Sequence, residues 1–506
     1  MSQVMEWGQD VYVVLNWALT LAGASWLAWL YIRERHQFVR PSVLLFAFAH
    51  LFFQWPLAVL SGAGDLYTWL PRPYDLVLLV HGFVLAGLAG TRVFGRAQAG
   101  ALWHRLESLS GESGPWGEMR SLGALSVIAV ALVGAYLSYV PFDCTGLYAL
   151  ITAPALATTV REMSLKLLPD AAPRYAFSFF ISAVALLLAA RLTLLQLAGF
   201  RARRWGLLAV TSAGWLLCAL AVLLQGAKGN LVYLILASLA AGLWISRLKI
   251  SGMTVLSAFG AVVVSAGIVW LISYSSMGNK SFDAKDHFVQ CGTRTGAPAA
   301  VIDEDMQRMQ IYISSVKEKA LARAIPSPEG AISVPEGAIP AQMFLRSLQA
   351  TAWRAFVGPF WVGTWYVHHA QTEGPVGVAG IRRLADWLGV PAVNLPNLIG
   401  RKYTENDLST ISAGAGYPFV WYAYFGLAGG LFAAAAAWLL DILVLALFHI
   451  EEVMLVPALS ALSVATLKFI EADYTVVWVS HGILVILAVS WVCGILARIG
   501  SPGRLG

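Results

Sequence analysis

Apolar segments of about 20 residues recur along the chain, and short polar connections separate most of them. A helix of this length crosses the hydrocarbon layer of a bilayer. Because that layer holds no water for backbone N–H and C=O groups, the segments are predicted to be helices, which satisfy those groups internally. The expected spans are 11–32, 42–61, 75–91, 121–141, 176–198, 205–225, 231–246, 252–274, 417–447, 453–470 and 476–497.

The pattern predicts an all-α, polytopic integral membrane protein with about 11 transmembrane helices. Composition excludes a soluble protein, because 58% of the 506 residues are hydrophobic and only 12% are charged, too few to cover an apolar core of this size. The opening "MSQVMEWGQD" lacks the basic start and the cleavage site of a signal peptide. The first apolar segment is therefore expected to remain as a span.

Positive charges in the connections predict the orientation, because cytoplasmic loops carry an excess of Lys and Arg. One alternate set of connections is rich in arginine: 33–40, 92–120, 201–204, 247–249 and the tail from 498. The other set carries fewer cations. This predicts an outer N-terminus and a cytoplasmic C-terminus, although the connection "HIEE" (449–452) is acidic on the side where the rule expects cations.

The same topology divides the chain into three parts: N-terminal helices in 1–274, a large outer loop region in 275–416, and C-terminal helices in 417–506. Connections as long as the second part are usually functional or disordered. Within it, 343–374 is aromatic and apolar but is interrupted by arginine, glycine and proline, which favours amphipathic or re-entrant helices. Irregular backbone at membrane depth requires a surrounding protein or wet cavity, so a cavity that opens outward is expected.

Several cations on the predicted outer side suit a phosphate or diphosphate ligand, because guanidinium groups bind phosphate oxygens in pairs and lysine supplies a point charge. Arg191 stands inside the span 176–198, where a cation without a partner is costly, so it should face a cavity or a partner. The alternative for each exposed cation is contact with lipid headgroups. The candidates for binding are Lys228, Arg191, Arg346, Arg354, Arg401 and Lys402.

Acids and bases on the same side are His368, His369, Glu373, Glu405, Asp407, Glu471, Asp473 and His481. Of these, His368 or His369 is the preferred general base and Asp407 the reserve. The alternative for the two histidines is hydrogen-bonded packing. Tyr403 completes the candidate binding residues. Rings that can stack on sugars, or instead form an interfacial aromatic belt, are Trp361, Trp365, Tyr366, Tyr417 and Trp421. No metal site, cofactor, nucleotide loop or nucleic-acid partner is expected.

The motifs "GAKGNLVYLIL", "WRAFVGPFWVGTWYVHH" and "AGYPFVWYAYFGLAGGL", on either side of a large outer loop, resemble the Wzy-type oligosaccharide repeat-unit (O-antigen or exopolysaccharide) polymerases. The likeness covers about 176–490. It departs from the family in one respect, since only one arginine-bearing outer loop is evident. The resemblance implies a multi-pass bacterial inner-membrane glycosyltransferase with a periplasmic site, acting on polyprenyl diphosphate-linked oligosaccharides. A chain-length regulator and a flippase of the same pathway are implied partners.

Such a transfer needs cations that stabilise the diphosphate leaving group and a base for the acceptor hydroxyl. Arg354 is the first candidate for the leaving group. A glycan ligase would need the same features, whereas a secondary transporter would show inverted repeats. Of the four cysteines, Cys218 and Cys493 fall inside spans and are expected to pack as apolar residues. Cys144 and Cys291 lie on the predicted oxidising face and are expected to form a disulfide.

Overall fold

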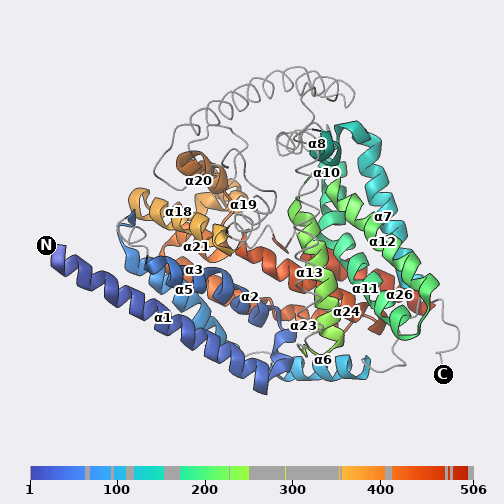
Figure 1. The fold of residues 1–506 in the computed structure, drawn as a ribbon. Helices are drawn as coiled ribbons and strands as arrows, with labels where there is room; N and C mark the ends of the chain where they lie inside the picture. The colour runs from blue at the N-terminus through green and yellow to red at the C-terminus, as the bar shows by residue number, and fades with distance from the viewer. Residues whose placement is uncertain are drawn as a thin grey trace, which may run out of the picture.

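The computed structural model describes residues 2–62, 69–92, 96–109, 119–152, 171–226, 228–249, 291, 353, 356–404, 413–472, 477–478 and 482–499, with the backbone alone at 2–9, 150, 152, 171–174, 228 and 404. Every element in these ranges is helical, as Figure 1 shows. The α-helices are α1 (Ser2–Arg33), α2 (Pro41–Ala49), α3 (Trp55–Ser61), α5 (Pro73–Gly90), α6 (Arg96–Leu109), α7 (Arg120–Tyr139), α8 (Gly146–Thr152), α10 (Ala171–Phe179), α11 (Ala185–Arg201), α12 (Trp205–Leu223), α13 (Lys228–Ile245), α18 (Gly358–Glu373), α19 (Arg382–Leu388), α20 (Leu395–Thr404), α21 (Tyr417–Phe425), α22 (Leu427–Leu439), α23 (Ile442–Leu447), α24 (Glu452–Leu467) and α26 (Ile483–Ile499).

Shorter helical segments extend several of these helices. The 3₁₀ segments are η1 (Arg35–Val39), η4 (Phe142–Cys144), η6 (Gly377–Gly380) and η7 (Lys468–Ile470), and the π segments are η2 (His50–Gln54) and η5 (Phe180–Val184). Proline stands in the first turn of α2, α5, α18 and α21. Its missing N–H costs nothing there, because the first-turn donors of a helix have no helical acceptor.

Within the described residues, eight helices are long and apolar enough to cross a membrane: Asp10–Arg33, Pro41–Ser61, Pro73–Gly90, Arg120–Tyr139, Tyr175–Arg201, Trp205–Leu223, Leu427–Leu447 and Glu452–Ile470. Gly229–Ile245 and Ile483–Ile499 are shorter apolar helices. These ten match ten of the predicted spans in position, which confirms a helical membrane protein. The predicted span 252–274 lies outside the described residues, so the count of 11 stays a prediction.

The predicted span 417–447 is wrong at its start. The chain breaks at Gly426, where φ is 64° and ψ is −148°, a conformation that favours glycine. The apolar run therefore forms two units: α21, and a candidate span that begins at Leu427. Helix α21 packs on α18, where the ring of Phe419 fills the space beside Gly363. Sequence hydropathy cannot find this break, because both units are equally apolar.

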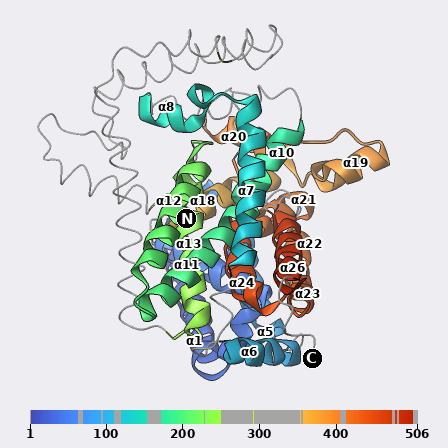
Figure 2. The same ribbon diagram turned by 90° about the vertical axis from the view of Figure 1, so that its right-hand side faces the viewer.

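The connections that the arginine pattern assigns to the cytoplasm meet at one end of the bundle, here called the α6 end because α6 lies along it (Figures 1 and 2). Arg96 pairs with Glu34 at 2.5 Å, and Arg40 pairs with Asp441 at 2.6 Å. The acidic connection 449–452 is also accounted for. Arg498 lies 3.4 Å from Glu451, and Arg105 donates to the carbonyls of Leu447, Phe448 and Ile450.

Helices α8, α18 and α20 lie at the opposite end, here called the α18 end (Figures 1 and 2). Gln371 of α18 donates to the carbonyl of Arg72 at 2.8 Å, which ties α18 to the start of α5. The predicted disulfide between Cys144 and Cys291 is present, with 5.6 Å between the Cα atoms. It joins the large loop region to the chain between α7 and α8, as the sequence predicts. Cys218 and Cys493 are buried and free.

Candidate functional site

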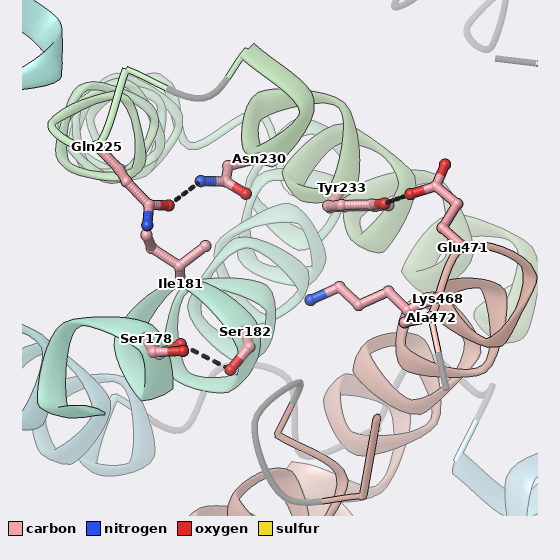
Figure 3. A pocket seen from close by; sticks show the side chains of 9 residues that line it. All are labelled: Ser178, Ile181, Ser182, Gln225, Asn230, Tyr233, Lys468, Glu471 and Ala472. Carbon is pink, nitrogen blue, oxygen red and sulfur yellow. Dashed lines mark hydrogen bonds between the residues drawn. The ribbon is translucent and has the colours of Figure 1, made fainter. Parts of the chain in front are cut away.

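A polar cavity of about 240 Å³ opens at the α18 end. Four parts of the chain supply its lining, shown in Figure 3: α10 with η5, the turn after α12, the start of α13, and the end of α24 with η7. The lining residues are Ser178, Ile181, Ser182, Gln225, Asn230, Tyr233, Lys468, Glu471 and Ala472. Because α12, α24 and α13 end or begin here, the cavity lies where candidate membrane helices terminate.

Lys468 contributes the central charge of this cavity. The residue is only 6% exposed, and its ammonium group points into the cavity (Figure 3). The nitrogen lies 5.0 Å from the centre of the Tyr233 ring. No carboxylate among the described residues lies within ion-pair distance of it. Lysine is rarely buried without a partner, so the charge calls for a ligand or for stabilisation by the ring and by the carboxyl end of α24.

The other polar groups of the cavity are held by one another. The Tyr233 hydroxyl donates to Glu471 at 2.6 Å, and the Asn230 amide donates to the Gln225 side-chain oxygen at 3.0 Å. This leaves the Gln225 amide nitrogen, with two further donors, at the cavity. Ser182 lies in the π segment η5 and donates to the carbonyl of Ser178 at 2.7 Å. π segments interrupt helices at many functional sites.

The disulfide stands next to the wall of the cavity. Gly146 follows Cys144 by two residues and packs against the backbone of Gln225, where a side chain would come within 2.3 Å of the carbonyl oxygen. Leu147 donates its backbone N–H to the carbonyl of Leu224 at 3.2 Å. The bond to Cys291 therefore fixes part of the large loop region close to the rim.

A second group of side chains at the α18 end is here called the aromatic–histidine cluster and consists of Trp69, Trp361, Trp365, His368 and Tyr403. The helical spacing of Trp361, Trp365 and His368 sets all three on one face of α18. The ring of His368 stacks on that of Trp69, with centroids 4.4 Å apart, and Trp365 stacks on Tyr403 at 5.8 Å. His368 Nδ1 lies 2.7 Å from the Tyr403 hydroxyl.

Charges around this cluster influence its protonation. Partial burial, followed by the positive charge of Lys402, lowers the pKa of His368, so its imidazole is neutral at pH 7. Lys402 donates a hydrogen bond to Glu373, and this bond lowers the pKa of the Glu373 carboxyl. Burial raises the pKa of Tyr403 to about 12, so its phenol stays protonated. A neutral imidazole held by a tyrosine is suited to accept a proton.

A short segment of backbone connects the cluster to the cavity. Tyr366 of α18 donates to the carbonyl of Ala413 at 2.6 Å, and the N–H of Ala413 donates to Pro396 of α20 at 2.9 Å. The next residue, Gly414, lies so close to Glu471 that a Cβ atom would come within 2.6 Å of its carbonyl oxygen. Ala413 and Gly414 therefore link the cluster to the cavity at this end of the bundle.

The structure brings together some of the predicted residues. His368, Lys402, Tyr403 and Trp365 lie in or beside the cluster, and Arg401 is exposed next to them on α20. His369 is only 4% exposed and its Nδ1 lies 3.9 Å from Glu373, so it is the less accessible histidine. Arg354 and Asp407, which are predicted for catalysis, and Arg346, which is predicted for binding, lie outside the described residues.

Two residues predicted to bind substrate are buried and bonded to the protein itself. Tyr417 is fully buried and its hydroxyl donates to the carbonyl of Ala433 at 2.7 Å, so its ring offers no face to a sugar. Arg191 is also fully buried, and its Nε donates to Ser121 at 3.2 Å. This confirms that Arg191 faces a partner, but nine residues of helix, about 13 Å, separate it from Ser182 in the cavity. Tyr366 is buried in the same way.

Lys228 is the first residue of α13, two positions before Asn230 of the cavity wall, and the structure describes only its backbone.

The important residue that sequence reasoning missed is Lys468. It stands within the predicted span 453–470, and a lysine inside an apolar span is itself a signal of function. The sequence presents Glu471 only as one of several acids, and nothing in the sequence pairs it with Tyr233.

Comparison of this chain with protein-family models, with curated proteins and with solved structures finds no match in any of the three.

Proposed function

We propose that this protein is a membrane glycosyltransferase of the polysaccharide polymerase type, acting at the periplasmic face of a bacterial inner membrane. It transfers a growing glycan from a polyprenyl diphosphate carrier onto a lipid-linked oligosaccharide repeat unit. The observation that carries the proposal is the meeting, at the α18 end, of a polar cavity with a buried lysine and a cluster of stacked aromatic rings with a neutral histidine. The resemblance of the sequence motifs supports it.

The chemistry requires three kinds of group. In the transfer, the acceptor hydroxyl oxygen forms a bond to the anomeric carbon while the bond from that carbon to the diphosphate oxygen breaks. The bonding electrons leave with the diphosphate, which needs a cation or hydrogen-bond donors. The hydroxyl proton passes to a base, and in this proposal the base is His368. The Nδ1–H of the neutral ring would then donate to the Tyr403 oxygen, which leaves Nε2 without a proton and facing the acceptor.

Aromatic rings serve the third requirement, because apolar faces of sugars pack on them. Trp361 is 40% exposed and stacks with Trp69 in the aromatic–histidine cluster, so a platform is available beside the proposed base. This arrangement favours a sugar-transfer enzyme over a secondary transporter. A transporter would hold its substrate near the middle of the membrane between inverted repeats.

A deletion and complementation experiment tests the proposal and separates the alternatives. Loss of long glycan, with single repeat units accumulating on the lipid carrier, is expected for a polymerase. Long polymer that stays on the carrier would instead identify a ligase. Repeat units trapped at the cytoplasmic face would identify a transporter. Restoration by the wild type but not by His368→Ala, at equal protein level, would connect the activity to the cluster.

A further inference from the structure

The proposed transfer at His368 leaves the cation that contacts the diphosphate unassigned, and the cavity around Lys468 contains a buried positive charge. Its ammonium group faces the cavity, and its one described contact is the face of the Tyr233 ring. Within the described part of the chain no hydrogen bond or ion pair satisfies this nitrogen. An ammonium group withdrawn from bulk water is stabilised when an anion contacts it.

The donors around the ammonium group come from several directions. The amide nitrogen of Gln225 is not used by another described side chain, and Asn230 lies in the first turn of the 18-residue helix α13. The unsatisfied N–H groups of a helix N-terminus favour an anion, and phosphate is the anion whose several oxygens can accept from separate donors at once. The buried Lys468 is a second, independent feature, and together with the N-terminus of α13 it indicates an anion-binding site.

The carboxylate of Glu471 argues against an anion and must be accounted for. The Tyr233 hydroxyl donates to it at 2.6 Å, and Figure 3 shows the carboxylate turned toward Tyr233 and away from the lysine nitrogen. The lysine nitrogen lies 5.0 Å from the centre of the Tyr233 ring, and no ion pair joins it to this carboxylate in the described residues. The cavity therefore has a cationic inner part and an acidic rim, rather than an internal ion pair.

The depth of the cavity points to a phosphate carried by a lipid. Candidate spans end at Leu223 and Ile470, and the apolar helix Gly229–Ile245 begins beside them. Lipid phosphates lie at the level where transmembrane helices end. We propose that the cavity is a phosphate-binding site with Lys468 as its charged contact, and that it holds the diphosphate of a lipid carrier; the identity of that carrier, unlike the anion site itself, rests on the proposed function.

Binding to the purified full-length protein in nanodiscs of neutral lipid tests the site. The probes are inorganic pyrophosphate and a polyprenyl diphosphate, and the variants are Lys468→Met and, as control, Lys249→Met, an exposed lysine outside the cavity. A lost charge-assisted contact predicts about 10- to 100-fold weaker binding of both probes in Lys468→Met. The control should bind as the wild type does. Competition of pyrophosphate with the lipid would show that both use one site, whereas lipid binding without competition would overturn the assignment of the phosphate to the cavity.

A second variant guards against misfolding. Gln225→Leu keeps the lysine and removes the free amide donor of the cavity wall, and it should also weaken both probes if Lys468→Met fails to fold. Wild-type binding in every folded variant would overturn the site and leave Lys468 as a cation at the carboxyl end of α24. Failure of the site is distinct from failure of the proposed function. Polymer formation by Lys468→Met at the wild-type rate would contradict the site alone. Pyrophosphate binding by a wild-type protein that makes no polymer would contradict the proposed function alone.

Discussion

Removal of the buried pair between Arg40 and Asp441 gives a quantitative test of how the two halves of the chain are joined. Arg40 is fully buried, and its Nε and Nη2 donate to Asp441 Oδ2 at 3.0 and 2.6 Å. Ser42 donates to the same carboxylate from its backbone N–H at 3.1 Å and from its hydroxyl at 2.7 Å. The pair therefore ties the start of α2 to the junction of α22 and α23.

The expected loss of unfolding free energy follows from the single buried charge that each substitution leaves without its partner. Asp441→Leu removes the acceptor of four hydrogen bonds and leaves the Arg40 guanidinium uncompensated, so a loss of about 3 to 5 kcal/mol in unfolding free energy is expected. Arg40→Met should cost a similar amount. The double variant removes both charges, and apolar replacement of a buried pair is often close to neutral, so it should be more stable than either single variant.

The assay is unfolding of the purified protein in mixed micelles with increasing sodium dodecyl sulfate, followed by circular dichroism. The control is Arg498→Met, which breaks the exposed pair with Glu451 at 3.4 Å and should cost less than about 1 kcal/mol. Two results would refute the reasoning. Single variants as stable as the control would show that the pair is not buried in the membrane-embedded protein, and losses that simply add in the double variant would show that the two residues do not interact.

Three other predictions concern the α18 end. Lys402→Gln removes a positive charge that lowers the pKa of His368, so the pKa of His368 should rise. The acidic limb of the pH–rate profile, where the base becomes protonated, should then move to higher pH. An unmoved limb would exclude His368 as the titrating base. Gly414→Ala should displace the backbone at Glu471 and reduce transfer activity, while Gly134→Ala, with no atom within 4 Å of the added carbon, should keep wild-type activity. Alkylation followed by mass spectrometry should find Cys144 and Cys291 protected until reduction, and labelling without reductant would disprove their bond.

Much of the fold follows from the sequence because the bilayer imposes a simple rule. Apolar runs near the thickness of the membrane predict most of the described spans within a few residues, with 417–447 the exception, and the arginine pattern correctly groups the connections that meet at the α6 end. The acidic connection at 449–452 departs from that rule because the cations that contact it, Arg105 and Arg498, belong to distant parts of the chain. Pairing over such distances has no local sequence signal.

The site was less predictable, for two physical reasons. The face of α18 that carries Trp361, Trp365 and His368 is visible as helical spacing, but their stacking partner Trp69 belongs to a distant connection. Lys468 lies within an apolar run that hydropathy treats as one span, so its position at a cavity depends on the neighbouring helices. Tyr417 lies near a predicted membrane boundary, and only the packing of the neighbouring helices shows that it is part of the core.

Reconstitution of the purified protein with lipid-linked repeat units is the most direct test of the central proposal. Proteoliposomes are supplied with polyprenyl diphosphate-linked oligosaccharide, and the products are separated by electrophoresis while released polyprenyl diphosphate is measured. The account predicts a ladder of longer lipid-linked glycans, with one polyprenyl diphosphate released for each new glycosidic bond, and a strong loss of both products in His368→Ala. Released lipid diphosphate without longer glycan, or no reaction with folded wild-type protein, would contradict it.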